Sequence, residues 1–518
     1  MSTSTKVDKG HLVLNTIFNT LAQLVSLVSV FFFTPLLVKD FGQTQYGLYI
    51  LAGSVVAYAA IFDFGIGTAL IRNVAEADAL DDNEKLHEDI QSALVINLAI
   101  GALVALVMFV LGVYVQTLFK ISPAHAYSLR WLLWINGGVQ FFYWPLSTAR
   151  LVLSGLKRYR SVATTSVFIV VGTMTSMAFV VIAHEGLIVL SLLAGFMLLA
   201  GHARNAVLVI KSLPPVRAGR SVVSFHKVST ATIKGMLIAG VPLFVIQLTS
   251  ALMRDQTDKV ILGVMVGGAA VALYEVGSKC SFLVSYLISL MCSAVLPVIT
   301  NLEAQNRKDD SRNFFARGTR YIAIVTLPVA VALFLLSRHF IVTWMGPGYG
   351  DSVLILRLLI GSQILMPFYI LGDSLLIARK KYSYWIKVSV IVALLNVGLS
   401  VLFVYRYGIW GVALGTLAAN LVDFPLRGSY VIREAGLKLR TWIEVCMWPA
   451  VPALLLLVGC YWVLVRTTLF ATLLGVVAGF GIMVAVYWAF MYIVGLKPWE
   501  RQQAIGFARR LLRGVGRS

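Results

Sequence analysis

Long apolar stretches separated by short polar segments dominate the pattern along this chain. A helix needs about 20 apolar residues to cross the hydrocarbon core of a membrane, and stretches of that length recur from end to end. The pattern predicts an all-α, polytopic membrane protein with about fourteen transmembrane helices. Their expected ranges are 12–38, 46–69, 90–117, 128–152, 161–183, 186–210, 235–254, 269–298, 319–343, 351–378, 384–405, 409–431, 441–465 and 469–495.

Composition supports the same class. Of the 518 residues, 59% are hydrophobic and only 13% are charged, and the mean hydropathy is +0.85. A chain of this kind could not cover ordinary globular domains with a wetted surface. The first apolar stretch follows Lys6 and Lys9, but no small-residue cleavage pattern follows it. We therefore expect it to stay as a helix and not to be removed as a secretion signal.

The net charge of +20 comes mainly from Lys and Arg residues in the loops between the predicted spans. With the N-terminus in the cytoplasm, most Lys and Arg residues fall in short cytoplasmic loops, as the positive-inside rule requires. Arg150 and Arg427 are grouped with these loops. Both termini are then cytoplasmic, and the basic tail 497–518 is expected to lie against anionic lipid as an amphipathic helix. A nucleic-acid partner is excluded, because the basic residues are not gathered on one face with aromatics.

Residue patterns for catalysis, metals and cofactors are missing from the sequence. The four cysteines lie in apolar spans without CxxC spacing, the seven histidines form no HExxH pair, and no GxxxxGK[ST] loop occurs. The longest predicted periplasmic segments are only about ten to fifteen residues, too short for a catalytic platform. We therefore expect no metal, no cofactor and no enzyme activity, which argues against a membrane glycosyltransferase, polymerase or ligase.

Three stretches of the chain each resemble a second stretch that follows at nearly the same distance along the sequence. The matches pair GLKRYRSVATTSVFIVVG with ARKKYSYWIKVSVIVALL, QYGLYIL with VALYEV, and SLRWLLW with ILRLLIG, at offsets of 223, 225 and 227. Six predicted spans precede the restart, and six is even, so both halves enter the membrane from the same side. The expected repeat is parallel, with its pseudo-twofold axis along the membrane normal, and a substrate would lie between the lobes.

These features predict five segments. The polar stretch around Pro214 and Pro215 marks the boundary between the lobes. The segments are an N-terminal six-helix lobe (1–211), a cytoplasmic linker (212–234), a C-terminal six-helix lobe (235–435), helices 13 and 14 outside the repeat (436–496) and the basic cytoplasmic tail (497–518).

Four stretches carry a family resemblance: TPLLVKDFGQTQYGLYIL (34–51), IFDFGIGTALIRNVAE (61–76), residues 240–279 and LNVGLSVLFVYRYGIWGVALGTLAAN (395–420). Together they resemble the polysaccharide-biosynthesis, O-antigen flippase (Wzx-like) branch of the multidrug/oligosaccharidyl-lipid/polysaccharide (MOP) exporters. The resemblance implies a flippase that carries polyprenyl-diphosphate-linked oligosaccharide across the bacterial inner membrane for O-antigen, capsule or exopolysaccharide assembly. It also implies membrane lipids, a polymerase and other glycan-assembly proteins as partners. A drug or small-metabolite antiporter of the same fold is the alternative.

The stretch IFDFGIGTALIRNVAEA (61–77) places Asp63 between two phenylalanines inside an apolar run. Gly65 and Gly67 are expected to interrupt or bend the second span. Asp63 then either faces the lumen between the lobes, or caps a short interfacial helix, or pairs with Arg72.

A diphosphate that passes an apolar layer needs water and cations. The candidate cations are Lys279, Arg357 and Arg254. Lys279 follows Glu275 by four residues, so an intrahelical ion pair is an equal alternative. Arg254 and Asp258 have the same spacing, and near the interface we expect them to form an exposed ion pair. Arg357 has no acid three or four positions away, although a snorkelling arginine would also explain it.

Without ATP chemistry, transport would draw on an ion gradient. Carboxylates that face a low-dielectric cavity can bind a proton in one state and release it in the other. The candidates for ion coupling or charge pairing are Asp63, Glu275, Asp258 and Asp373. Asp373 lies within two turns of a basic loop, and neutralising that loop is the alternative role.

Overall fold

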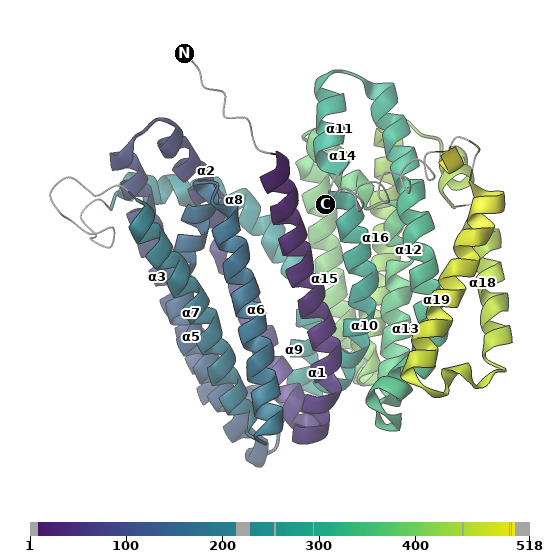
Figure 1. The fold of residues 1–518 in the computed structure, drawn as a ribbon, viewed down its shortest axis with the longest axis horizontal. Coiled ribbons are helices and arrows are strands. Elements are labelled where there is room, and N and C mark those ends of the chain that lie inside the picture. Colours follow the sequence, from purple (N-terminus) through teal and green to yellow (C-terminus); the bar gives the residue numbers. More distant parts are fainter. Residues whose placement is uncertain are drawn as a thin grey trace. The chain divides into compact units, whose positions relative to one another are not determined.

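The computed structural model describes residues 9–213, 228–252, 255–293, 295–447, 450–496, 498 and 500–502. Most of the predicted linker and of the basic tail, and Arg254, lie outside the described residues. Every regular element in the described part is helical (Figure 1). The chain divides into two compact units, residues 1–272 and 273–518. The lobe boundaries deduced from the sequence stay a prediction.

The first unit contains a run of helices that ends within α10. Its elements are α1 (Lys9–Tyr58), η1 (Ala59–Asp63), α2 (Ile66–Ala79), α3 (Asn83–Val113), α4 (Val115–Leu118), α5 (Pro123–Gly155), α6 (Tyr159–Ile182), α7 (Leu187–Ser212), α8 (Thr230–Leu252) and α9 (Asp255–Met265). The helix α10 (Gly268–Ser293) passes from the first unit into the second. Helices α8 and α9 belong to the first unit because α8 packs against α2 and α3, and α9 packs against α1.

The second unit ends with a pair of helices that the sequence places outside the repeat. Its elements are α11 (Val295–Ala304), α12 (Lys308–Met345), η3 (Pro347–Tyr349), α13 (Gly350–Gln363), η4 (Met366–Phe368), α14 (Leu371–Ala378), α15 (Tyr382–Tyr407), α16 (Trp410–Glu434), α17 (Leu439–Trp442), η5 (Ile443–Met447), α18 (Val451–Leu464), η7 (Thr468–Ala471), α19 (Leu473–Phe490) and η8 (Met491–Gly495).

Many of these helices can cross a membrane. Within the described ranges, nine stretches are long and apolar enough: Val28–Asp63, Asn83–Val113, Tyr159–Ile182, Leu187–Ser212, Gly268–Ala304, Lys308–Met345, Pro347–Phe368, Ser383–Tyr407 and Leu473–Gly495. Helices α5 and α16 have 33 and 25 residues and are also long enough, but each carries several charged or amide side chains. The expectation of an all-α, polytopic membrane protein is confirmed.

The break predicted for the second span is confirmed. Helix α1 kinks at Gly42, whose φ of 77° suits glycine, and its second part ends at Tyr58. The chain then passes through η1 and two left-handed residues, Phe64 and Gly65, before α2 begins at Ile66. Left-handed backbone costs little at glycine, so Gly65 provides the sharp turn. The turn separates α1 from α2 and places Asp63 at the start of α2.

Four helices of the first unit and four of the second begin at nearly constant spacing along the chain. Asn83 and Lys308, the first residues of α3 and α12, are 225 positions apart, and α5 and α13 begin 227 positions apart. Both α6 and α15, and α7 and α16, begin 223 positions apart. These are the offsets at which the sequence matches itself.

Small residues let α15 and α16 approach closely. Gly411 and Gly415 form a G-x-x-x-G pattern on α16, and a Cβ on Gly415 would lie 2.5 Å from the backbone nitrogen of Ser400 on α15. Asn396 on α15 also donates a hydrogen bond to Thr416 on α16 at 3.1 Å. Backbone contact of this kind replaces the hydrophobic driving force that helices lack inside lipid.

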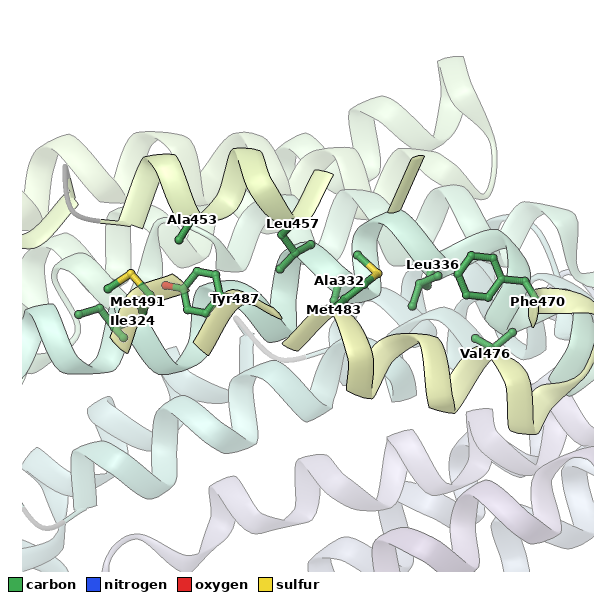
Figure 2. Close-up of a cluster of buried hydrophobic side chains, with 10 residues drawn as sticks. All are labelled: Ile324, Ala332, Leu336, Ala453, Leu457, Phe470, Val476, Met483, Tyr487 and Met491. Carbon is green, nitrogen blue, oxygen red and sulfur yellow. The ribbon is translucent and has the colours of Figure 1, made fainter. Parts of the chain in front are cut away.

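The last two helices pack on α12 through an apolar cluster. Figure 2 shows its members on α12, α18, η7, α19 and η8: Ile324, Ala332, Leu336, Ala453, Leu457, Phe470, Val476, Met483, Tyr487 and Met491. All ten are buried. The pair α18 and α19 is therefore attached to the second unit along α12.

The glycine contact predicts a stability difference between two similar variants. Gly415→Ala should lower the unfolding free energy by about 1–3 kcal/mol, because its Cβ meets the α15 backbone. Gly398→Ala on α15 is the control, since a Cβ there meets no atom within 4 Å. The measurement is the apparent Tm of each purified full-length variant in detergent. Equal Tm values would contradict the close approach of α15 and α16.

Candidate functional site

A cavity of about 790 Å³ lies within the first unit, and we call it the α5 cavity. Its walls come from α1, η1, α2, α5, α7, α8 and α9. The polar side chains that line it are Asp63, Thr68, Gln140, Ser147, Arg150, Gln247 and Gln256, and the aromatic ones are Tyr58, Tyr143 and Trp144. Cationic, amide and aromatic groups are thus gathered in one hollow.

Asp63 lies at one wall of this cavity and caps α2. Its carboxylate accepts hydrogen bonds from the backbone N–H of Gly67 and from the side chain of Gln247 on α8. A carboxylate at a helix N-terminus satisfies backbone donors that have no partner inside the helix. The capping alternative is therefore supported, and the carboxylate also lines the cavity. The nearby cation is Arg150 and not Arg72.

Arg150 is the cation that sequence reasoning missed. We grouped it with the following cytoplasmic loop, but α5 continues to Gly155 and carries Arg150 on its last turns, where it lines the cavity. Its guanidinium forms no ion pair or hydrogen bond with any described residue. A hydrogen bond from Asn97 on α3 to Thr148, at 2.8 Å, and the close approach of Gly101 to the carbonyl of Phe141 hold this part of α5.

The aromatic residues beside Arg150 add two further features. The indole Nε1 of Trp144 is buried and has no hydrogen-bond partner in the part of the chain that the structure describes. The ring of Tyr143 meets the edge of His202 on α7, with centroids 5.0 Å apart at 88°. Tyr143 and Trp144 therefore lie at a cavity wall, and Tyr143 also packs against α7.

Lys279 is paired, as the structural alternative predicted. Its Nζ lies 3.1 Å from Oε1 of Glu275 on α10, and the two side chains are 16% and 8% exposed. A pair at i,i+4 with the acid first is the favourable order on a helix. The role of Lys279 in cargo binding stays a prediction, and it would require this pair to open.

Asp258 differs from what we expected. We expected Asp258 and Arg254 to form an exposed ion pair. Asp258 is only 2% exposed, so the predicted exposure is wrong. Helix α9 packs against α1, and next to Asp258 the hydroxyl of Tyr58 donates to Thr257 at 2.5 Å. This packing buries the face of α9 that the sequence placed at the interface.

Asp373 belongs to a buried charge cluster in the second unit. Nη1 of Arg427 lies 3.1 Å from Oδ1 of Asp373, and Nε of Arg427 lies 3.0 Å from Oδ1 of Asp423. The guanidinium also donates to Ser389 and lies over the ring of Tyr369. We counted Arg427 with the cytoplasmic loop charges although it falls within the predicted span 409–431; it is inside α16 and its side chain is 7% exposed.

Arg357 lies in a separate cavity of about 620 Å³ inside the second unit. Its Nε donates to the Ser337 hydroxyl at 2.8 Å, and the guanidinium lies over the Phe334 ring. The candidate residues in the described part of the chain are therefore spread over five places. Asp63 lines the α5 cavity, Asp258 is buried on α9, Glu275 and Lys279 pair on α10, Asp373 joins the Arg427 cluster, and Arg357 lines its own cavity. No group of three or more His, Cys, Asp or Glu that could hold a metal occurs among the described residues.

Comparison with known proteins gives a family and a fold. The family model described as polysaccharide biosynthesis protein matches residues 12–303, more than half of the chain. The probable low-salt glycan biosynthesis flippase Agl15 of Haloferax volcanii is 20% identical over 408 residues, which cover 77% of this chain and 79% of that protein.

Two solved structures share the fold. The lipid II flippase MurJ in an inward closed conformation matches with a TM-score of 0.68 at 17% identity, over 93% of this chain and 98% of MurJ. A multidrug resistance MATE family transporter of the MOP superfamily, facing inward, matches with a TM-score of 0.64 at 16% identity, over 80% of this chain and 94% of the transporter.

The charge cluster predicts that Arg427 stabilises the fold. Arg427→Gln leaves Asp373 and Asp423 buried without their cation, so we expect a loss of about 3–5 kcal/mol of stability. Arg440→Gln is the control, because Arg440 and Glu444 form an exposed pair with side chains 91% and 58% exposed. A pair of that kind contributes less than about 1 kcal/mol.

The measurement is again the apparent Tm in detergent, with the double variant Asp423→Asn/Arg427→Gln added. The double variant should recover part of the loss, because it removes one of the two uncompensated carboxylates. A Tm for Arg427→Gln equal to that of Arg440→Gln would contradict the cluster.

Proposed function

This chain belongs to the polysaccharide biosynthesis protein family, and we propose that it is a flippase for polyprenyl-diphosphate-linked oligosaccharide. The cargo would cross a bacterial inner membrane for O-antigen, capsule or exopolysaccharide assembly, beside a polymerase and other glycan-assembly proteins. The family is one of transporters and not of enzymes, and the chain is a multi-pass membrane protein with the MOP fold. The names of Agl15 as a probable glycan biosynthesis flippase and of MurJ as a lipid II flippase support the proposal.

The observation that carries this proposal is Arg150 in the α5 cavity. A diphosphate loses its hydration when it leaves water, and a guanidinium replaces it with charge-assisted hydrogen bonds. The Arg150 guanidinium forms no ion pair or hydrogen bond with a described residue, so its N–H groups are available to a ligand, and the Asp63 carboxylate lines the same cavity. The amide groups of Gln140 and Gln247 and the ring of Tyr143 are groups of the kind that bind sugars.

The proposed architecture has fourteen spans in two parallel six-helix lobes, with α18 and α19 as an added pair. The constant offsets between helix starts support the repeat. Six spans in each half would give both lobes the same orientation and leave both termini in the cytoplasm. Transport would proceed by alternating access, as the repeat architecture favours.

Carboxylates are the proposed ion-coupling groups, and Asp63 is the first of them. It lies in the α5 cavity together with Arg150, so its protonation would change the charge that the cargo meets. Glu275 is held by Lys279, and Asp373 by Arg427, so each would have to leave its partner before taking part. Asp258 is buried on α9 and is proposed as a pairing residue.

A drug or small-metabolite antiporter is the second candidate. The fold match to a MATE multidrug transporter supports it. The two candidates differ in the charge of their cargo. With Asp63 protonated, the α5 cavity would carry the positive charge of Arg150 and favour an anionic cargo such as a diphosphate over a cationic drug.

Complementation tests the proposal and the site together. In a cell that lacks its glycan flippase, this chain should restore surface glycan, and Arg150→Gln should reduce it by about tenfold or more because the phosphate contact is lost. Arg150→Lys keeps the charge and should restore part of the function. Arg160→Gln, at an exposed position of α6, is the control. The measurement is surface glycan normalised to the amount of protein in the membrane.

Normal glycan with Arg150→Gln would contradict the site. Failure of the unaltered chain to restore glycan, together with drug export that it confers, would favour the antiporter.

Ion coupling is tested in sealed vesicles that contain the protein and the lipid-linked oligosaccharide. An imposed proton or sodium gradient should accelerate transport by the unaltered chain, and Asp63→Asn, which cannot ionise, should lose this acceleration. Asp309→Asn is the control, because Asp309 is an exposed residue paired with Arg312. Equal transport with and without either gradient would remove ion coupling from the account.

A further inference from the structure

The cavity that contains Arg357, which we call the α12–α13 cavity, is built only from the second unit. Its volume is about 620 Å³. One face of the last turns of α12 supplies Arg338 and His339, and the first turns of α13 supply Val353 and Arg357. The η7 turn between α18 and α19 closes it with Phe470. The cavity therefore lies where the added helix pair meets the six-helix part of the unit.

The charge in this cavity is positive and is not neutralised. Arg338, Arg357 and His339 line it, and none of the residues that line it is acidic. Neither arginine forms an ion pair with any described residue. Ser337 accepts one hydrogen bond from Nε of Arg357 at 2.8 Å, and the Phe334 ring lies 5.7 Å from its guanidinium carbon. These two contacts position the side chain and leave the four N–H groups on its Nη atoms without a described partner.

Apolar side chains, which we call the apolar wall, complete the lining of this partly open cavity. Val342, Val353, Leu354 and Phe470 line it, and Leu354 is 37% exposed. A hollow lined by two guanidinium groups together with aliphatic and aromatic groups suits an amphipathic anion. Its volume is in the range of sites for small molecules.

We propose that the α12–α13 cavity binds a phosphate group, and that this phosphate is carried by a phospholipid headgroup. Arginine binds phosphate oxygens in a bidentate manner. The apolar wall would hold the glycerol and the start of an acyl chain, which free phosphate lacks. The Arg338 end of α12 is also the end predicted to reach the periplasmic surface of the membrane, where headgroups lie. The bound lipid would join α12 and α13 to the α18–α19 turn. This site is independent of the cargo proposed above.

Native mass spectrometry of the purified full-length chain in detergent tests the proposal, with phosphatidylglycerol and inorganic phosphate as separate probes. Arg338→Gln and Arg357→Gln should each weaken phosphatidylglycerol binding by about tenfold, because each removes a charge-assisted contact. Arg406→Gln, at an exposed position at the end of α15, is the matched control and should bind as the unaltered chain does. An unchanged Tm shows that each variant is folded.

A second variant leaves both arginines in place. Ala471→Leu, on the exposed η7 turn, narrows the apolar side of the cavity. It should weaken phosphatidylglycerol binding and leave any binding of inorganic phosphate unchanged. If inorganic phosphate displaced the lipid and bound equally well to Ala471→Leu, the proposal that a phospholipid supplies the phosphate group would be wrong. Wild-type lipid binding in both arginine variants would overturn the site, and wild-type lipid binding in Ala471→Leu would overturn the role of the apolar wall.

Discussion

A charge inside a membrane-spanning protein needs an opposite charge, a hydrogen-bond partner or water, and this requirement divides the charged residues of this chain into two groups. Lys279 and Arg427 lie inside helices and are paired with acids at 3.1 Å or less. Arg150 and Arg357 form no ion pair with a described residue, and both line cavities. Pairing stabilises the fold, whereas an unpaired cation at a cavity wall is available to an anion from outside the chain.

Positions related by the proposed repeat have different surroundings in the two units. Tyr369 and Arg427 follow Tyr143 and His202 by 226 and 225 residues, close to the repeat offset. In each half an aromatic ring contacts a basic side chain, at 5.0 Å for Tyr143 and His202 and at 6.0 Å for Tyr369 and Arg427. In the second unit two aspartates neutralise the arginine. In the first unit the α5 cavity lies next to this contact, because Tyr143 lines it. Divergence after duplication would thus leave one half with a structural cluster and the other with a binding cavity.

The sequence allowed the membrane class, the family and the break near Asp63 to be predicted, because each depends on local composition, ordered motifs or glycine chemistry. The i,i+4 pair of Glu275 and Lys279 was also foreseen, since helix geometry brings those positions together. The partners of Asp373 and Asp63 could not be found in this way. Arg427 is 54 positions from Asp373, and Gln247 is on a different helix from Asp63. Such contacts depend on how helices pack and not on spacing.

Arg150 and Arg427 were misplaced for a related reason. Both residues fall in the last turns of predicted spans, 128–152 and 409–431, but we counted them with the loop charges, whereas α5 continues to Gly155 and α16 to Glu434. A charge near the end of a predicted span can therefore be a buried partner or a cavity residue, and only the helix end and its neighbours distinguish these cases from a loop.

Reconstituted transport tests the central claim most directly. Liposomes that contain the purified chain and a defined polyprenyl-diphosphate oligosaccharide, present only in the inner leaflet at the start, are treated with an impermeant glycan-cleaving enzyme outside. The account predicts that the unaltered chain exposes the oligosaccharide to the enzyme far faster than protein-free liposomes do, and that Arg150→Gln does not. Equal exposure with the unaltered chain, with Arg150→Gln and without protein would contradict it.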